Sequence, residues 1–148
     1  MGPTEERWIM KNMLVVLVTL AMVVGASAQV GRYDFALANA PYSEASDFID
    51  RLAAGSFSRA TDYVADSARG DVTAQVLEAA WIDLLERYGQ YQGNEVTGAD
   101  VDGDKWHVHV KCTFQKAKVD AIVSFSTVQE LGKVTGISFN KLRGNDLR

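Results

Sequence analysis

Apolar and polar side chains alternate strictly between residues 105 and 114, which read KWHVHVKCTF. Successive side chains of a β-strand point to opposite faces, so this pattern predicts a strand with one face against a hydrophobic core. The alternate positions that carry apolar side chains are Trp106, Val108, Val110, Cys112 and Phe114. A period of two, rich in β-branched and aromatic residues, extends from Gly89 to Phe139. It predicts four strands, over residues 92–101, 105–114, 118–127 and 133–139.

The links between these strands are only a few residues long. A parallel connection needs a dozen or more residues, so the strands must form antiparallel hairpins in a meander. Before Gly89 the apolar period is that of a helix, and three helices are expected. Pro41 opens the first and Gly55 ends it, Ser56 caps a short second helix, and Asp71 caps the long third. Three helices followed by four strands predict an α+β fold with the helices on one sheet face.

The N-terminal region has the features of an export signal. Residues 13–24 read MLVVLVTLAMVV and are followed by the small residues of ASAQ, so residues 1–28 are predicted to be a signal peptide. The protein is then exported to the periplasm, the cell surface or the medium. The apolar run is shorter than the ~20 residues that cross a bilayer comfortably, although an uncleaved leader would anchor the chain in the membrane. Glu5 and Glu6 are unusual before such a run, and Met10 is the expected start of translation.

After the leader we expect a spacer over residues 29–40, a single α+β domain over residues 41–140 and a polar tail over residues 141–148. About 120 residues suffice for one domain with one core. Loss of the leader removes two basic and two acidic residues, so the net charge stays at −4. This charge does not favour nucleic-acid binding. The single cysteine, Cys112, cannot form an intramolecular disulfide.

Both histidines lie near the cysteine in the sequence, but their side chains are expected on the opposite face of the strand. His107 and His109 are on the polar side of their strand and Cys112 is on the apolar side. The expected partner strand offers only Asp120 as a further ligand, so we predict no metal site and no carboxylate partners for the histidines. Residues 100–104 imitate a calcium loop but lack its essential glycine and glutamate, and predict a hairpin turn at Asp102–Gly103 instead.

The inward positions of the two central strands carry no acid or base. If Val101 pairs with Trp106, simple alternation puts Glu95 on the inner face near the open end, where it is the one candidate carboxylate. We therefore consider a pocket with aromatic walls, as ligand sites often have. Its candidate residues are Tyr63, Trp81, Tyr88, Trp106 and Glu95. The alternative is that these aromatic residues form ordinary core. No cofactor-binding motif is present, and no cofactor is expected.

Four segments together resemble domain of unknown function 3887. They are FIDRLAAGSFSRATDYVADSA, LEAAWIDLLERYGQY, HVHVKCTFQKAKVDAIVSFS and GKVTGISF, and the likeness covers residues 46–139. That family is similar to the nuclear transport factor 2-like, or cystatin-like, cone fold. The resemblance implies helices that cap a strongly curved sheet, a cone whose mouth can hold a ligand, and an outer sheet face that can pair two subunits. It implies no catalytic residues.

We therefore expect a small exported, non-enzymatic domain that binds a small apolar ligand or a partner. The expected partner is a second copy, bound through the outer face with His107, His109, Lys111, Ile122 and Ser124. The alternative is a small cone-fold enzyme that uses Glu95 at the mouth of its pocket.

Overall fold

The computed structural model describes residues 40–144, and within them three α-helices pack on a four-stranded antiparallel sheet. The helices are α2 (Tyr42–Ala53), α3 (Phe57–Ala60) and α4 (Ala74–Tyr88). Two short 3-10 helices, η1 (Thr61–Tyr63) and η2 (Asp66–Ala68), lie between α3 and α4. The predicted α+β class is confirmed. The predicted signal peptide lies outside the described residues, as do nearly all of the spacer and residues 145–148 of the tail.

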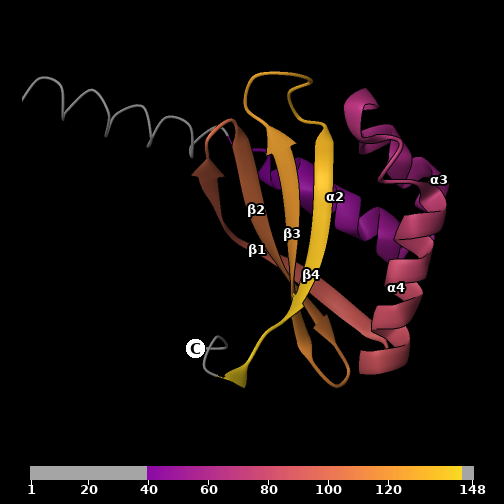
Figure 1. The fold of residues 1–148 in the computed structure, drawn as a ribbon. Helices are drawn as coiled ribbons and strands as arrows, with labels where there is room; N and C mark the ends of the chain where they lie inside the picture. Colours follow the sequence, from indigo (N-terminus) through magenta and orange to yellow (C-terminus); the bar gives the residue numbers. More distant parts are fainter. Residues whose placement is uncertain (1–39, 145–148) are drawn as a thin grey trace, which may run out of the picture. The chain divides into compact units, whose positions relative to one another are not determined.

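The sheet is a meander in which each strand pairs with the next along the chain. Its strands are β1 (Tyr91–Asp102), β2 (Lys105–Phe114), β3 (Lys118–Ser126) and β4 (Val134–Lys141). Asp102 pairs with Lys105, so Gly103 and Asp104 form the β1–β2 turn, one residue later than predicted. Gly103 has a φ of 60°, a value that glycine adopts without the cost of a Cβ contact. The helices lie on one side of the curved strands, and none of the helices that the structure describes covers the other side (Figure 1).

The core lies between the helices and the inner face of the sheet. Ala45, Phe48, Ile49 and Leu52 form the buried stripe of α2, as their helical spacing predicts. Leu77, Trp81 and Leu84 do the same for α4. In β2 and β3 every side chain that points to the inner face of the sheet is buried. Among the described residues, every buried one is apolar, so the layer is held together by hydrophobic burial.

The predicted start of α4 is wrong by two residues. Thr73, rather than Asp71, is the N-cap, and its hydroxyl accepts a hydrogen bond of 3.2 Å from the backbone N–H of Val76. The second helix ends at Ala60. Val64 leaves helical geometry to form a parallel bridge with Val134 of β4, and the N–H of Ala65 donates to the Val134 carbonyl at 2.9 Å. This bridge joins the helical layer to the edge of the sheet.

The predicted inner position of Glu95 is wrong as well. Val101 does pair with Trp106, but the register shifts between Val96 and Gly98. Val96 faces Val110 and Gly98 faces His109, so Thr97 is an extra residue in a β-bulge. The bulge reverses the parity of residues 93–96, up to a second register shift between Tyr91 and Gly93. Glu95 therefore lies opposite Lys111 on the outer face, and its inner-face neighbour is Asn94.

Replacement of the N-cap hydroxyl is expected to weaken α4. Thr73→Ala should lower the free energy of unfolding by about 1 kcal/mol, because the Val76 N–H loses its acceptor. Asp71→Ala is the matched control and should change stability by less than about 0.5 kcal/mol, as ordinary surface substitutions do. Urea denaturation at one fixed protein concentration measures both values. An equal or larger loss for Asp71→Ala would contradict this description of the helix start.

Candidate functional site

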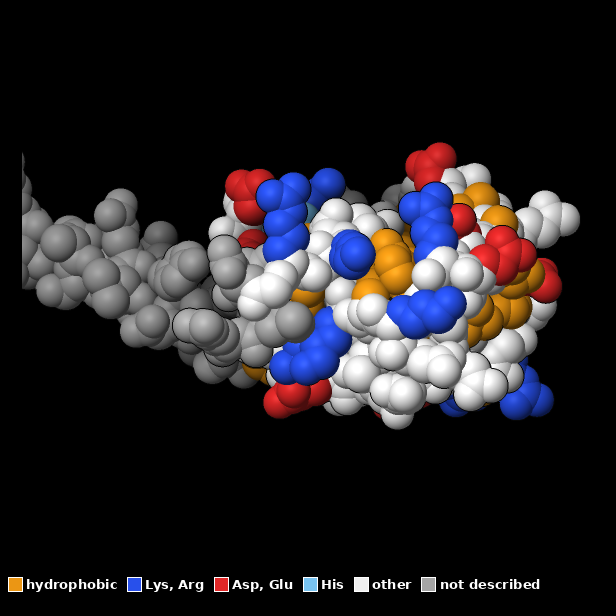
Figure 2. Space-filling model, turned by 90° about the horizontal axis from the view of Figure 1, so that it is seen from below, with side chains coloured by type: hydrophobic (Ala, Val, Ile, Leu, Met, Phe, Trp, Pro, Cys, Tyr) orange, Lys and Arg blue, Asp and Glu red, His pale blue; other side chains and the backbone are white. Residues whose placement is uncertain are grey.

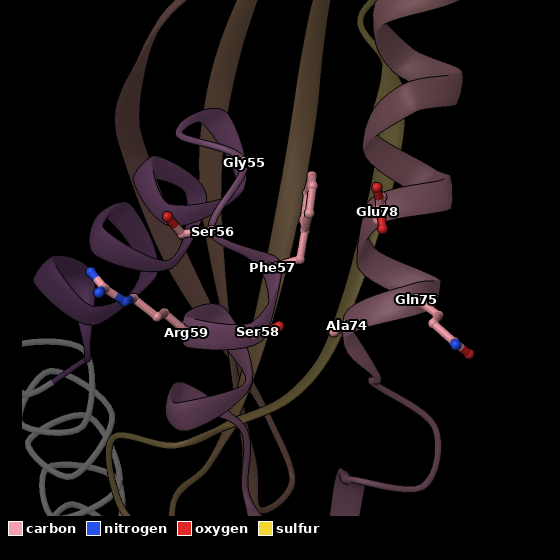
Figure 3. Close-up of a pocket in the computed structure, with 8 residues that line it drawn as sticks. All are labelled: Gly55, Ser56, Phe57, Ser58, Arg59, Ala74, Gln75 and Glu78. Atoms are coloured by element: carbon pink, nitrogen blue, oxygen red, sulfur yellow. The ribbon is translucent and has the colours of Figure 1, made fainter.

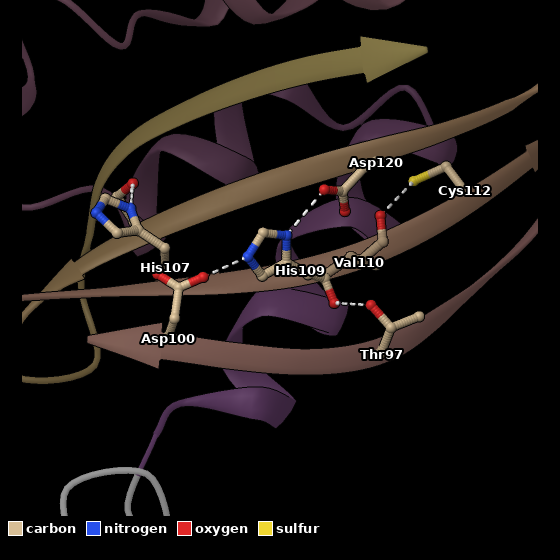
Figure 4. A network of polar contacts seen from close by, with 8 residues as sticks. Thr97, Asp100, His107, His109, Val110, Cys112 and Asp120 are labelled. Carbon is tan, nitrogen blue, oxygen red and sulfur yellow. Dashed lines mark hydrogen bonds and ion pairs between the residues drawn. The ribbon is translucent and has the colours of Figure 1, made fainter. Parts of the chain in front are cut away.

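A chain of polar contacts crosses the outer face of the sheet, with His109 at its centre (Figure 4). His109 Nδ1 lies 2.8 Å from Asp120 Oδ2 of β3, and its Nε2 lies 2.7 Å from Asp100 Oδ2 of β1. Strand pairing explains the geometry, because Asp100 and Asp120 each lie diagonally opposite His109 across a strand pair. The imidazole is thus held on both sides by carboxylates. We call His109, Asp100 and Asp120 the imidazole bridge.

The imidazole bridge favours the charged form of His109. An ionised carboxylate can only accept hydrogen bonds, so each ring nitrogen must carry a proton to bind its aspartate. Burial on its own lowers the pKa of His109, but the hydrogen bonds to Asp120 and Asp100 and the charges of both aspartates outweigh it. The net pKa of His109 is raised above its usual value.

Two neighbouring contacts extend the bridge along the sheet. His107 Nδ1 lies 2.9 Å from the Ser124 hydroxyl, and Lys111 Nζ lies 3.1 Å from Glu95 Oε2. The expectation that the histidines lack carboxylate partners is wrong for His109. Sequence reasoning missed Asp100 because it considered partners only on the following strand, although the predicted pairing of Val101 with Trp106 already places Asp100 opposite His107.

Cys112 takes no part in this surface, as parity predicts. Its side chain is fully buried on the inner face, and its thiol points toward the Val110 carbonyl at 3.7 Å. Burial raises the pKa of the Cys112 thiol to about 12, with smaller contributions from the charges of Asp120 and Asp50. Within residues 40–144 no group of three or more His, Cys, Asp or Glu side chains has the geometry to hold a metal ion.

The five residues proposed for an aromatic pocket are not gathered in one place. Trp81 and Tyr88 pack against Phe114 at one end of β2, with ring centres 5.6 and 6.3 Å away. Trp106 is buried at the other end of β2, and eight residues of strand span about 26 Å. Tyr63 lines a cavity beside α3, and Glu95 is on the outer face. Trp81 and Trp106 are 3% and 8% exposed, so both belong to the core.

The aromatic end of the domain approaches the surface between basic side chains. Figure 2 shows this end, where Lys and Arg side chains surround a strip of hydrophobic ones. Lys141 Nζ lies 5.7 Å from the centre of the Tyr88 ring, within the range of a cation–π contact. Tyr91 joins the cluster at 5.3 Å from Trp81.

A polar group on the inner side of β1 also escaped sequence analysis. Asn94 donates from Nδ2 to Asp50 Oδ1 at 2.7 Å and to the Tyr91 hydroxyl at 2.6 Å. The Ser46 hydroxyl donates to Asn94 Oδ1 at 3.1 Å. These contacts tie α2 to the edge strand. Burial is the main cause of the raised pKa of Tyr91.

A cavity of about 540 Å³ lies between α3 and α4 (Figure 3). Its lining residues are Gly55, Ser56, Phe57, Ser58, Arg59, Ala74, Gln75 and Glu78. The Arg59 and Gln75 side chains diverge from each other in Figure 3. A ligand site needs polar groups that converge on one point, and these two do not.

Comparisons with known proteins do not link this geometry to a family. No protein-family model, curated protein or solved structure matches the chain. In the part of the chain that the structure describes, no helix is both long and apolar enough to cross a membrane.

The imidazole bridge should make stability depend on pH. The folded pKa of His109 lies above its unfolded value, so the contribution of the bridge is fully present below the unfolded pKa of about 6.5 and fades as pH rises through the folded pKa. The stability difference between the wild type and His109→Asn should therefore be larger at pH 6 than at pH 8.5, by up to about 1 kcal/mol because the site is partly exposed.

Urea denaturation at the two pH values measures this difference. His107→Asn is the matched control, since its ring meets the Ser124 hydroxyl instead of a carboxylate. A difference for His109→Asn that stays constant or grows toward pH 8.5 would contradict a charged imidazole between Asp100 and Asp120.

Proposed function

We propose that this chain is an exported, non-enzymatic binding domain that pairs with a second copy of itself through the outer face of the sheet. The observation that carries the proposal is the state of that face. No helix among the described elements covers it (Figure 1), yet five of its ionisable groups are already held in contacts of opposite charge, those of Glu95, Asp100, His109, Lys111 and Asp120. Pre-ordered side chains lose less entropy on binding than free ones, so this surface suits association.

Binding is favoured over catalysis by where the ionisable groups lie. General acid–base chemistry needs a titratable group inside a concavity, close to the reacting atoms. In residues 40–144 the buried side chains are all apolar, and the imidazole bridge lies on an open sheet face. The alternative enzyme depended on Glu95 at a pocket mouth. The Glu95 side chain is instead 69% exposed and paired with Lys111 on the outer face, so this alternative loses its catalytic group.

A second copy is the occupant that fits this face. Acidic groups and the basic Lys111 alternate across it, so two copies related by a two-fold axis can place opposite charges against each other. Ile122, half-buried beside His109, supplies an apolar centre. Four strands of at least eight residues cover roughly 500 Å². That is the order of the ~800 Å² that each partner buries in a standard interface.

The resemblance to domain of unknown function 3887 supports the same proposal. Helices followed by a four-stranded antiparallel sheet are compatible with a nuclear transport factor 2-like cone, and the resemblance implies pairing through the outer face. The apolar run at residues 13–24 supports export. A small apolar ligand is not part of the proposal, because the aromatic residues expected to enclose it are packed in the core.

The proposal predicts a dimer in solution. Sedimentation equilibrium should give twice the chain mass at about 100 μM, since a standard interface binds more tightly than that. Ile122→Asp should give a folded monomer, because it places an unpaired charge at the centre of the interface. Val76→Asp is the control: it adds the same charge at a residue 52% exposed on α4, and should remain dimeric. A monomeric wild type would refute pairing through this face.

A further inference from the structure

Three basic side chains from separate parts of the chain line one cavity of about 410 Å³. Arg51 comes from the last turn of α2, Arg59 from α3, and Lys133 from the residue before β4. Asp62 and Tyr63 complete the lining. Three positive charges against one negative charge are a local exception in a chain of net charge −4. The volume of the cavity falls in the range of small-molecule sites.

The contacts of Arg51 and Lys133 are with neutral groups. The Arg51 guanidinium lies 6.0 Å from the centre of the Tyr63 ring, and Lys133 Nζ donates to the backbone carbonyl of Asp62 at 2.7 Å. Both partners are neutral. None of the ion pairs between described residues involves Arg51, Arg59 or Lys133. The fold therefore gathers three cations around one cavity, where Asp62 is the one lining carboxylate.

The nearest turn keeps Lys133 in position without supplying a counter-charge. The Lys133 N–H donates to the Glu130 carbonyl at 3.0 Å. The Glu130 carboxylate accepts from the Asp66 N–H at 2.8 Å and from the Ser67 hydroxyl at 3.2 Å. Glu130 is thus used to anchor the β3–β4 loop to η2. Its φ of 45° is an uncommon value for a residue with a side chain, and such values persist where surrounding contacts hold them.

We propose that this cavity binds a small molecule that carries a multiply charged oxoanion, a phosphate ester or a polycarboxylate. Guanidinium groups present N–H donors in a planar fork that matches the oxygens of both anions. Lys133 adds a third donor, and the Tyr63 ring and hydroxyl can contact the rest of the ligand. A bound anion also relieves the repulsion among three neighbouring cations. This site goes beyond the proposed dimer, because it lies among α2, α3 and the β3–β4 loop.

Isothermal titration calorimetry of the purified protein tests the site with two probes, sodium pyrophosphate and sodium citrate. At about 150 mM NaCl, where non-specific attraction is screened, at least one probe should bind with a Kd below about 1 mM. Stronger binding of pyrophosphate assigns the site to phosphate esters, and stronger binding of citrate to polycarboxylates. Arg59→Gln and Lys133→Gln, both at exposed positions, should each weaken that probe about tenfold, as loss of a charge-assisted hydrogen bond does.

Arg87→Gln is the matched control. It removes the same charge from α4, where Arg87 is paired with Asp83 at 3.0 Å, and binding should be unchanged. Ile122→Asp should also bind normally, so failure of the dimer and failure of this site are distinguishable. The proposal is overturned if neither probe binds at about 10 mM, or if Arg87→Gln weakens binding as much as Arg59→Gln.

Discussion

Burial of alternate side chains of β2 and β3 against the helices is the interaction on which the structure depends. Burying one Val or Phe side chain is worth about 1.5–3 kcal/mol, and the inner parity of these two strands supplies nine buried side chains. An exposed ion pair is worth about 1 kcal/mol or less. A slip by one residue would turn every inner side chain outward. The apolar face therefore sets which side chains point outward, and the imidazole bridge forms where the strand pairing brings His109 between two aspartates.

The sequence predicts the fold well where the alternation of apolar and polar residues is unbroken, and poorly where a bulge interrupts it. The alternation of β2 and β3 has no irregularity between them, and the burial of Cys112 follows from it, whereas alternation alone does not determine which residues of the two strands pair. In β1 the extra residue at Thr97 has no clear mark in the sequence. It moved Glu95 to the outer face and brought Asn94 to the inner one. The contact between His109 and Asp100 lies between this bulge and the β1–β2 turn, where the predicted pairing of Val101 with Trp106 holds, so it follows from that pairing and was overlooked because only the following strand was considered for partners.

The helical region shows a related limit. Apolar spacing located α2 and α4, since each buries one continuous stripe. The segment between them is set by tertiary contacts, in particular the bridge from Val64 to Val134 and the anchoring of Glu130 on η2. The basic cavity is built from this segment together with the end of α2 and the residue before β4. No spacing in the sequence brings Arg51, Arg59 and Lys133 together, because they meet only after the helices have packed on the sheet.

The most direct test of the account is the reactivity of the Cys112 thiol. A side chain with no exposed surface and a pKa raised to about 12 by burial should not react with a thiol reagent at about pH 8. Reaction should begin only when denaturant unfolds the protein. Lys116→Cys in a Cys112→Ala background puts the thiol on the exposed β2–β3 hairpin and should react in the native state. If native Cys112 reacted as fast as that variant, the alternation that separates the core from the outer face would be contradicted.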